Sequence, residues 1–393
     1  MKPRMLIMLV VAALVAAAAS PSAAAAPRPV STNAEAAALI DVESGRLLYS
    51  HNGDKRMRIA SLTKIMTAIV AIEHGDLSDI VKTGRRAAGK EGSSIYLRVG
   101  DEMSLHHLLY GLMLRSGNDA AVAIAEHVGG SEEGFVHLMN EKARELGLEN
   151  THFMNPHGLD HDDHYSSAND LARLTAYALR NPVFREIVKT RVKKVPNPNA
   201  EWDHVWTNKN KMLLMYEGAD GVKTGYTKLA GRCLVSSATR NGQQLAAVTL
   251  NDGDDWADHR KLLDWGFEHY PLLTIAEEGR KIAGYRLAVA RPFRYPLAEG
   301  ERERITTRLV VRPQDDVRTR LGDVGRLEFR MDGVPIGSVP LKLLESPDDK
   351  GRREKRSAAR AAGAAEEPAE IPSGRSLPAA LRVVILTLLT RGV

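Results

Sequence analysis

The chain has 393 residues, of which 44% are hydrophobic and 26% charged, and its formal net charge is +5. At about 100 to 200 residues per domain this length favours two domains over one, with enough apolar side chains for a real core, so disorder throughout is excluded. From residue 350 onward nine Lys and Arg stand against four Glu, an excess that equals the whole net charge. The remainder is nearly neutral, and nucleic-acid binding is not expected.

The first 26 residues predict an export signal. Lys2 and Arg4 precede an apolar run from Met5 to Ala19, and small residues follow up to Ala26. A membrane span that stays attached is the alternative, but the run is shorter than the roughly 20 apolar residues that cross a bilayer. The body is therefore expected outside the cytoplasm. The single Cys233 can form no internal disulfide there, so the core must stabilise the fold.

The body of the chain, residues 27–273, mixes strand and helix periodicity. Residues 36–52 predict a hairpin, and residues 221–250 predict another that turns at Asn241-Gly242. The apolar spacing typical of helices occurs over residues 59–74, 105–114, 120–128, 133–146, 169–179 and 256–269.

Three segments follow the body. Residues 274–345 predict a small β-rich domain, with strands over 305–312 and 327–331. Residues 346–376 are charged, Ala-rich and interrupted by Pro and Gly, which predicts a flexible linker.

The last segment, 377–393, predicts an amphipathic helix. Its apolar residues share one arc of a helical wheel: Leu377, Leu381, Val384, Ile385, Leu388 and Leu389. From Pro378 to Arg391 such a helix would be about 21 Å long at 1.5 Å per residue, against about 30 Å for the membrane core. It should therefore lie in the membrane interface, with the basic residues from Lys350 to Arg356 attracted to anionic lipids. A helix packed on the body is the alternative.

Three short motifs are candidates for chemistry. The first, Ser61-Leu62-Thr63-Lys64, places a hydroxyl and an amine three positions apart on one helix face. Lys64 could take the proton of Ser61 if burial or nearby positive charge lowers its pKa. By itself the pattern is also common on solvated helices.

The other two motifs are equally common in isolation. Ser116-Gly117-Asn118 joins two predicted helices, where such residues are usually a turn or a cap. In Lys223-Thr224-Gly225, the first two side chains offer donors to a carboxylate, and Gly225 would let a ligand approach the strand edge closely.

In this order the motifs resemble those of the penicillin-recognising serine enzymes, and most closely the low-molecular-mass D-alanyl-D-alanine carboxypeptidases. Residues 155–159, 164–168 and 220–227 match the same family. The resemblance covers the exported body, the β-rich segment and the terminal apolar segment, and it is therefore nearly full length. It implies an α+β, transpeptidase-like domain with an antiparallel sheet flanked by helices, followed by the small β-rich domain and the anchoring helix.

The resemblance also implies site roles. Ser61 would be the nucleophile and Lys64 its general base, Ser116 would pass a proton to the leaving amine, and Asn118 would bind the substrate amide or orient Lys64. Lys223 and Thr224 of the third motif would meet the terminal carboxylate beside Gly225, and the backbone N–H groups of Ser61 and Tyr226 would form the oxyanion hole.

The implied partners are peptidoglycan stem pentapeptides, β-lactam antibiotics and the outer face of the cytoplasmic membrane of a bacterium. No cofactor is implied. One departure concerns the substrate carboxylate, because the family often carries an Arg in the stretch that corresponds to residues 251–258, where this chain has none. Arg260 is the nearest candidate.

Alternative functions stay open at this point. A β-lactamase is disfavoured because the second motif is not Ser-Asp-Asn and no Glu-x-x-Leu-Asn pattern occurs. A non-catalytic cell-wall-binding relative is disfavoured because every catalytic position is filled, whereas a D,D-endopeptidase differs only in cleft shape. The acidic and histidine-rich stretch from His157 to His164 could bind zinc by composition, but its spacing fits no standard zinc helix, so we expect no metal.

Overall fold

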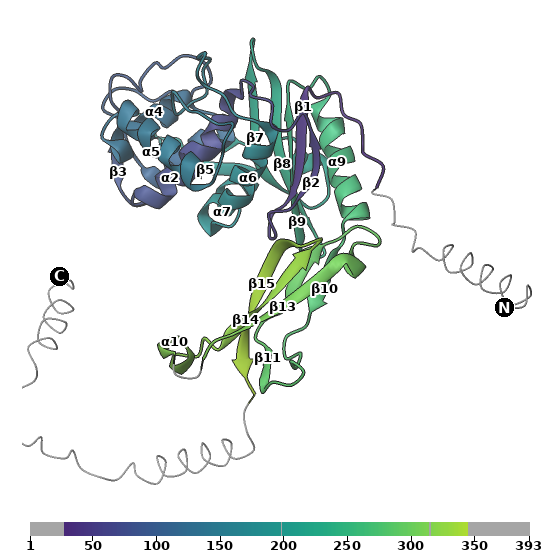
Figure 1. The fold of residues 1–393 in the computed structure, drawn as a ribbon. Coiled ribbons are helices and arrows are strands. Elements are labelled where there is room, and N and C mark those ends of the chain that lie inside the picture. The colour runs from purple at the N-terminus through teal and green to yellow at the C-terminus, as the bar shows by residue number, and fades with distance from the viewer. Residues whose placement is uncertain (1–26, 198, 314–315, 345–393) are drawn as a thin grey trace, which may run out of the picture. The chain divides into compact units, whose positions relative to one another are not determined.

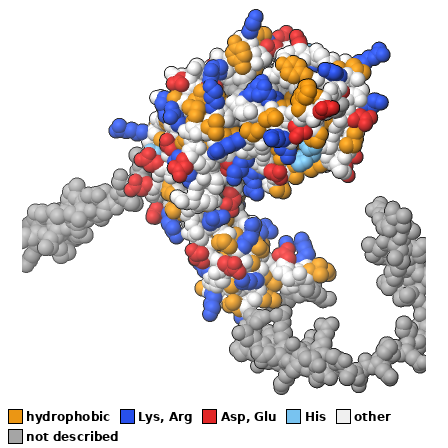
Figure 2. Space-filling model, turned by 180° about the vertical axis from the view of Figure 1, so that it is seen from behind, with side chains coloured by type: hydrophobic (Ala, Val, Ile, Leu, Met, Phe, Trp, Pro, Cys, Tyr) orange, Lys and Arg blue, Asp and Glu red, His pale blue; other side chains and the backbone are white. Residues whose placement is uncertain are grey.

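The structure is a computed structural model that describes residues 27–197, 199–313 and 316–344. The predicted signal peptide, linker and C-terminal helix lie outside the described residues. Figure 1 shows the described elements, and on the face seen in Figure 2 basic and acidic side chains are interspersed.

A five-stranded antiparallel sheet, in the order β2-β1-β9-β8-β7, forms the centre of the body. Both predicted hairpins are present. The first pairs β1 (Ala36–Asp41) with β2 (Leu47–His51), and the second pairs β8 (Gly231–Arg240) with β9 (Gln243–Leu250). Asn241 and Gly242 both have positive φ, as a tight hairpin turn requires. The remaining strand, β7 (Ala219–Thr227), is at the edge of the sheet.

Helices cover both faces of this sheet. The contacts of α6 (Ala168–Ala178) are with β1 and β9, and those of α9 (Asp255–His269) are with β8 and β9 (Figure 1). Successive residues of β1 belong alternately to two core clusters: Ala38 and Ile40 lie in one, and Ala37 and Leu39 in the other. Burial on both faces explains why this strand reads as a continuous apolar run.

The other helices pack beside the sheet, around α2 (Lys64–His74), which is buried along most of its length. They are α3 (Leu105–Tyr110), α4 (Asn118–Gly129), α5 (Glu132–Glu145) and α7 (Pro182–Lys189). Two predicted helices are not uniform. Residues 60–63 form a 3₁₀ helix, η1, before α2, and residues 111–115 form a π-helix, η2, after α3.

Several short elements had no counterpart in the prediction. They are α7, α8 (Met212–Met215), the pair β3 (Ile80–Lys82) and β4 (Glu102–Ser104), and the pair β5 (Val192–Val195) and β6 (His204–Thr207).

The segment after α9 is rich in strands, as predicted. Strands β10 (Leu272–Ala276) and β12 (Phe293–Pro296) pair, and a second sheet has the order β11-β15-β14-β13. Its strands are β11 (Leu287–Val289), β13 (Ile305–Val311), β14 (Gly325–Met331) and β15 (Val334–Leu343), with the short η3 (Arg302–Arg304) and α10 (Val317–Arg320) between them. Among the described residues, the helices are all too short or too polar to cross a membrane.

Candidate active site

The first motif lies where η1 passes into α2. Ser61 is in the 3₁₀ turn and Lys64 is the first residue of α2, so the spacing of three brings the Lys64 Nζ to 3.0 Å from the Ser61 Oγ. Lys64 is fully buried, whereas Ser61 borders a cleft. The predicted contact between the two side chains is therefore present in the structure.

The Lys64 amine has two further partners. It donates to the Asn118 Oδ1 at 2.7 Å and to the backbone oxygen of His157 at 2.6 Å. Both of these oxygens can only accept hydrogen bonds. When the amine is neutral, its two N–H bonds point to them and its lone pair is left for the hydroxyl of Ser61.

The surroundings of Lys64 favour this neutral form. Burial lowers its pKa well below the ordinary value, and the positive charges of Lys223 and Lys209 lower it further, against a smaller opposing effect of Asp119. The two conditions that the sequence argument set for a lysine base, burial and nearby positive charge, are both met.

The second motif follows the π-helix η2. Ser116 ends η2 with a left-handed backbone, φ +64°, and Asn118 begins α4. While its oxygen accepts from Lys64, the Asn118 amide nitrogen donates to the Glu91 backbone oxygen at 2.6 Å. Asn118 thus links the lysine to the loop over residues 91–97. The buried carboxylate of Asp119, which sequence reasoning did not select, fixes the same loop through the backbone N–H groups of Ile95 and Leu97.

The third motif lies on β7, which runs directly past η1. A Cβ atom on Gly225 would lie 3.1 Å from the Ser61 backbone nitrogen. The glycine therefore permits close approach of the chain's own turn that carries Ser61, whereas the sequence analysis expected a ligand there. Lys223 is buried beside it and donates to the Thr224 backbone oxygen at 2.8 Å, and burial together with the charge of Lys209 lowers its pKa to about 7.

These elements surround a cleft of about 440 Å³. It is lined by five of the predicted residues: Ser61, Ser116, Thr224, Gly225 and Tyr226. Lys64, Asn118 and Lys223 do not line the cleft and are buried.

Two basic residues of the cleft were missed by sequence reasoning. Lys209 donates to the Ser93 Oγ at 3.1 Å, and Arg232 on β8 forms an ion pair with Asp255 at the start of α9. The suggested Arg260 is exposed on α9 and does not line the cleft. Strand β7 pairs with β8 in a register that places Tyr226 opposite Arg232. A prediction of this strand pairing could have identified Arg232.

The histidine-rich loop packs inward against the turn that carries Ser61. The His164 Nδ1 accepts from the Met154 N–H at 3.0 Å, and its Nε2 lies 2.7 Å from the Thr63 Oγ1. Burial lowers the pKa of His164 to about 3. By contrast, His161 and Asp162 are exposed. Within the part of the chain that the structure describes, no group of three or more His, Cys, Asp and Glu side chains could hold a metal.

Cys233 forms part of the cleft wall. Its side chain is buried, and burial raises the pKa of the thiol to about 12. Thiolate chemistry is therefore not available at this position near neutral pH.

Residues 21–254 match the family model described as D-alanyl-D-alanine carboxypeptidase, Peptidase_S11. The chain belongs to this family. It is 33% identical over 333 residues to the D-alanyl-D-alanine carboxypeptidase DacF of Bacillus subtilis, covering 79% of this chain and 85% of that protein. It is also 33% identical to DacC of Escherichia coli, over 82% of this chain and 86% of that protein.

Solved structures of this family are similar as well. Penicillin binding protein 5 from Haemophilus influenzae aligns with a TM-score of 0.66 and 28% identity, over 81% of this chain and 99% of that one. A point mutant of the Streptomyces K15 DD-transpeptidase aligns with a TM-score of 0.58 and 33% identity, over 61% of this chain and the whole of that one. The predicted family and its α+β, transpeptidase-like fold are confirmed.

Proposed function

We propose that this protein is a serine-type D-alanyl-D-alanine carboxypeptidase that removes the terminal D-Ala from peptidoglycan stem pentapeptides and is acylated by penicillin. The observation that carries the proposal is the contact between Ser61, at the edge of the cleft, and the buried amine of Lys64. The names of the relatives support the substrate class.

In the acylation step, the Ser61 Oγ attacks the carbonyl carbon of the penultimate D-Ala and its proton passes to the Lys64 Nζ. The oxyanion that forms accepts from the backbone N–H groups of Ser61 and Tyr226. Ser116 then relays this proton from Lys64 to the amine nitrogen of the terminal D-Ala as the C–N bond breaks. Water hydrolyses the resulting ester and frees Ser61.

The substrate carboxylate requires positive charge at the other end of the cleft. Thr224 of the third motif lines the cleft and supplies a donor, and Lys223 is buried behind it and contributes charge. Arg232 and Lys209 add two cations that line the cleft. A guanidinium can pair with a carboxylate through two parallel hydrogen bonds. We assign Arg232 this role in place of Arg260, with Asp255 holding it between substrates.

The proposal extends to the domains and the location of the chain. Residues 27–273 form the peptidase domain and residues 274–345 the β-rich domain, in accord with the Streptomyces enzyme, whose entire chain aligns with 61% of this one. Residues 1–26 direct export, and residues 377–393, joined by the linker 346–376, anchor the enzyme at the outer face of the cytoplasmic membrane of a bacterium. The charge pattern of residues 2–4 and the apolar arc from Leu377 to Leu389 support this arrangement.

The decisive experiment is mass spectrometry of a purified stem pentapeptide after incubation with the enzyme. Loss of one alanine supports the carboxypeptidase, and the Ser61→Ala variant, as the matched control, should leave the peptide intact. An unchanged peptide with the wild-type enzyme contradicts the proposal and favours a binding protein. A cross-linked dimer of stem peptides, incubated in parallel, reports any endopeptidase activity.

A further inference from the structure

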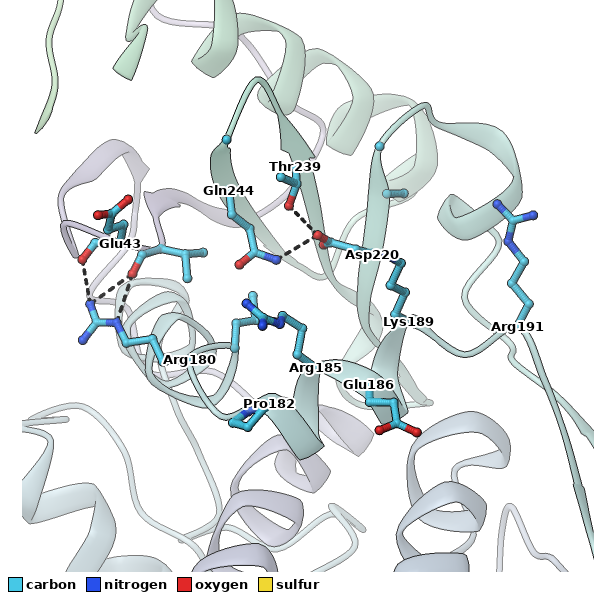
Figure 3. Close-up of a pocket in the computed structure, with 15 residues that line it drawn as sticks. Glu43, Arg180, Pro182, Arg185, Glu186, Lys189, Arg191, Asp220, Thr239 and Gln244 are labelled. Atoms are coloured by element: carbon cyan, nitrogen blue, oxygen red, sulfur yellow. Dashed lines mark hydrogen bonds between the residues drawn. The ribbon is translucent and has the colours of Figure 1, made fainter. Parts of the chain in front are cut away.

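A second cavity, of about 1050 Å³, lies beside α7 across the ends of β1, β7, β8 and β9 (Figure 3). Charged side chains of both signs line it, and Asp220 there accepts from the side chains of Thr239 and Gln244. This lining selects no single kind of ligand, and it shares no residue with the cleft. The groups that can act on Lys64 lie instead in the loop behind it, over residues 155–159.

His157 lies in this loop with its side chain buried. Its Nδ1 accepts from the Leu159 N–H at 3.2 Å, so the proton of the neutral imidazole is on Nε2. Burial lowers the pKa of His157, against an opposing effect of Glu132, and the ring is therefore neutral near pH 7. His157 thus presents a buried N–H donor at Nε2.

Glu132, the first residue of α5, is the carboxylate that faces this donor. Its Oε1 lies 3.4 Å from the His157 Nε2, although Nε2 makes no hydrogen bond to any described residue. Buried N–H groups almost always have an acceptor, and a small rotation of the Glu132 side chain would supply one. The interaction with His157 holds the pKa of Glu132 below its ordinary value, against partial burial, and the charge of Lys90 lowers it further. The acceptor is therefore an ionised carboxylate near neutral pH.

The backbone of the same histidine holds Lys64. The His157 oxygen accepts from the Lys64 Nζ at 2.6 Å, and the Pro156 oxygen accepts from the Thr67 Oγ1, on the same helix, at 2.6 Å. Gly158 follows directly, with φ +87°, so this peptide can rotate more freely than one that precedes a residue with a Cβ atom. An imidazole held at both of its nitrogens restrains that rotation.

We propose that Glu132 is a positioning residue for the catalytic lysine: its carboxylate accepts from the His157 Nε2–H and so keeps the His157 oxygen on the Lys64 amine. This proposal rests on the proposed function, in which Lys64 is the general base. Glu132 does not line the cleft and acts through His157. Without its carboxylate the amine is held less firmly beside the Ser61 Oγ, and proton transfer from the hydroxyl becomes slower.

The first test measures the rate of acylation by labelled penicillin. Glu132→Ala should slow it about tenfold, the factor expected for one lost hydrogen bond to a charged group. Glu132→Gln keeps an acceptor oxygen on a side chain of the same length and should recover most of the rate. The matched control is Glu133→Ala, which removes the neighbouring, exposed carboxylate that pairs with Arg86. It should be acylated as fast as the wild type.

A double-mutant cycle with His157→Ala tests whether Glu132 acts through the imidazole. His157→Ala removes the ring and keeps the backbone oxygen, so adding Glu132→Ala to it should change the acylation rate by less than about twofold. A merely structural effect of Glu132 would lower the rate by the same factor in both backgrounds.

A second readout is independent of the reaction. In protein with isotope-labelled histidine, the nuclear magnetic resonance signal of the His157 Nε2–H, assigned by its absence in His157→Ala, should shift upfield in Glu132→Ala and stay in place in Glu133→Ala. If penicillin does not acylate the wild type, the proposed function fails, and this signal alone decides whether Glu132 holds His157. The proposal is overturned if Glu132→Ala leaves the signal or the acylation rate of an active wild type unchanged, if its full effect persists without the His157 ring, or if Glu133→Ala slows acylation equally.

Discussion

At the scale of single residues, the amine of Lys64 is held by more than its contact with Ser61. The oxygens of Asn118 and His157 also accept from it and fix its direction. The base role of Lys64 can therefore be tested by removing the amine alone.

The first prediction is that Lys64→Ala slows acylation by labelled penicillin by about two to four orders of magnitude, the usual range for a general base. Ser61→Ala should give no label at all. The measurement is the rate of covalent labelling, followed by gel fluorescence. Near-normal labelling of the Lys64 variant would mean that another group accepts the proton.

The second prediction concerns the charge on Lys223, whose pKa is lowered to about 7 by burial and by Lys209. Below that pH the ammonium is charged and attracts the substrate carboxylate, and above it the charge is lost. The kcat/KM for a peptide with a free carboxylate should therefore fall as pH rises through about 7. The same peptide with an amidated terminus should show no such fall, and Lys223→Arg should move the fall to much higher pH. If kcat/KM for the peptide with the free carboxylate still rises with pH at pH 9, the role of Lys223 is contradicted.

At the scale of elements, the site depends on how closely the histidine-rich loop packs against η1. Gly158 has φ +87°, and a Cβ atom there would lie 2.0 Å from the Ala60 backbone oxygen, beside Ser61. Because the atoms in contact belong to the backbone of the loop and of η1, neither segment can move away without a shift of its main chain.

The third prediction follows from that contact. Gly158→Ala should lower the free energy of unfolding by about 1 to 2 kcal/mol for the left-handed backbone and by a further roughly 1 to 3 kcal/mol for the steric clash, and it should slow acylation. Gly89→Ala is the control, because Gly89 also has positive φ but nothing within 4 Å of the added Cβ. Urea denaturation measures the free energy of unfolding of both variants. Equal losses in the two variants would show that the contact with η1 contributes nothing.

The fourth prediction concerns the packing of α9 on the sheet. His259 is fully buried between Ser236 and Thr249, and burial lowers its pKa to about 3 from an ordinary 6.5. Its neutral form therefore stabilises the fold fully above pH 6.5, and this contribution is lost progressively as pH falls toward 3. From pH 7 to pH 5 the loss should be roughly 2 kcal/mol.

Denaturant unfolding at the two pH values tests this contribution. The His259→Gln variant should show a smaller difference between pH 7 and pH 5 than the wild type, by that amount. A glutamine in place of His74, which is exposed at the end of α2, should leave the difference unchanged. An unaltered pH dependence in the His259 variant would assign acid sensitivity to other groups.

The elements also show what the sequence could predict. The hairpins and the longer helices follow from periodicity and from Asn241-Gly242, and the contact between Ser61 and Lys64 follows from their spacing. The switch to 3₁₀ and π geometry at residues 60–63 and 111–115 could not be predicted, because packing against β7 and the loop over residues 91–97 sets it. Arg232 was missed for a similar reason, since it reaches the cleft from a neighbouring strand.

At the scale of the whole molecule, the fifth prediction is that deleting Leu377 to Val393 releases the enzyme from membranes and leaves hydrolysis of a small soluble substrate intact. Six apolar residues, at roughly 1.5 to 3 kcal/mol each when buried, could supply on the order of 10 kcal/mol before ordering costs. Each basic residue adds only about 1 kcal/mol, which salt screens. Fractionation with and without high salt separates the two contributions.

The intact protein should stay with the membrane in high salt. Release of most of it by salt alone would make the tail a basic surface contact, and loss of activity in the truncated form would mean that the tail supports the fold.

The buried Cys233 has a practical consequence for the whole chain. It is the only cysteine in the sequence, and its raised pKa and burial keep it in the unreactive thiol form. Maleimide reagents should therefore leave the native protein unlabelled. A cysteine introduced at exposed Lys189, the last residue of α7, would then be the single reactive site, so a fluorophore could report on that helix while Cys233 stays in the cleft wall.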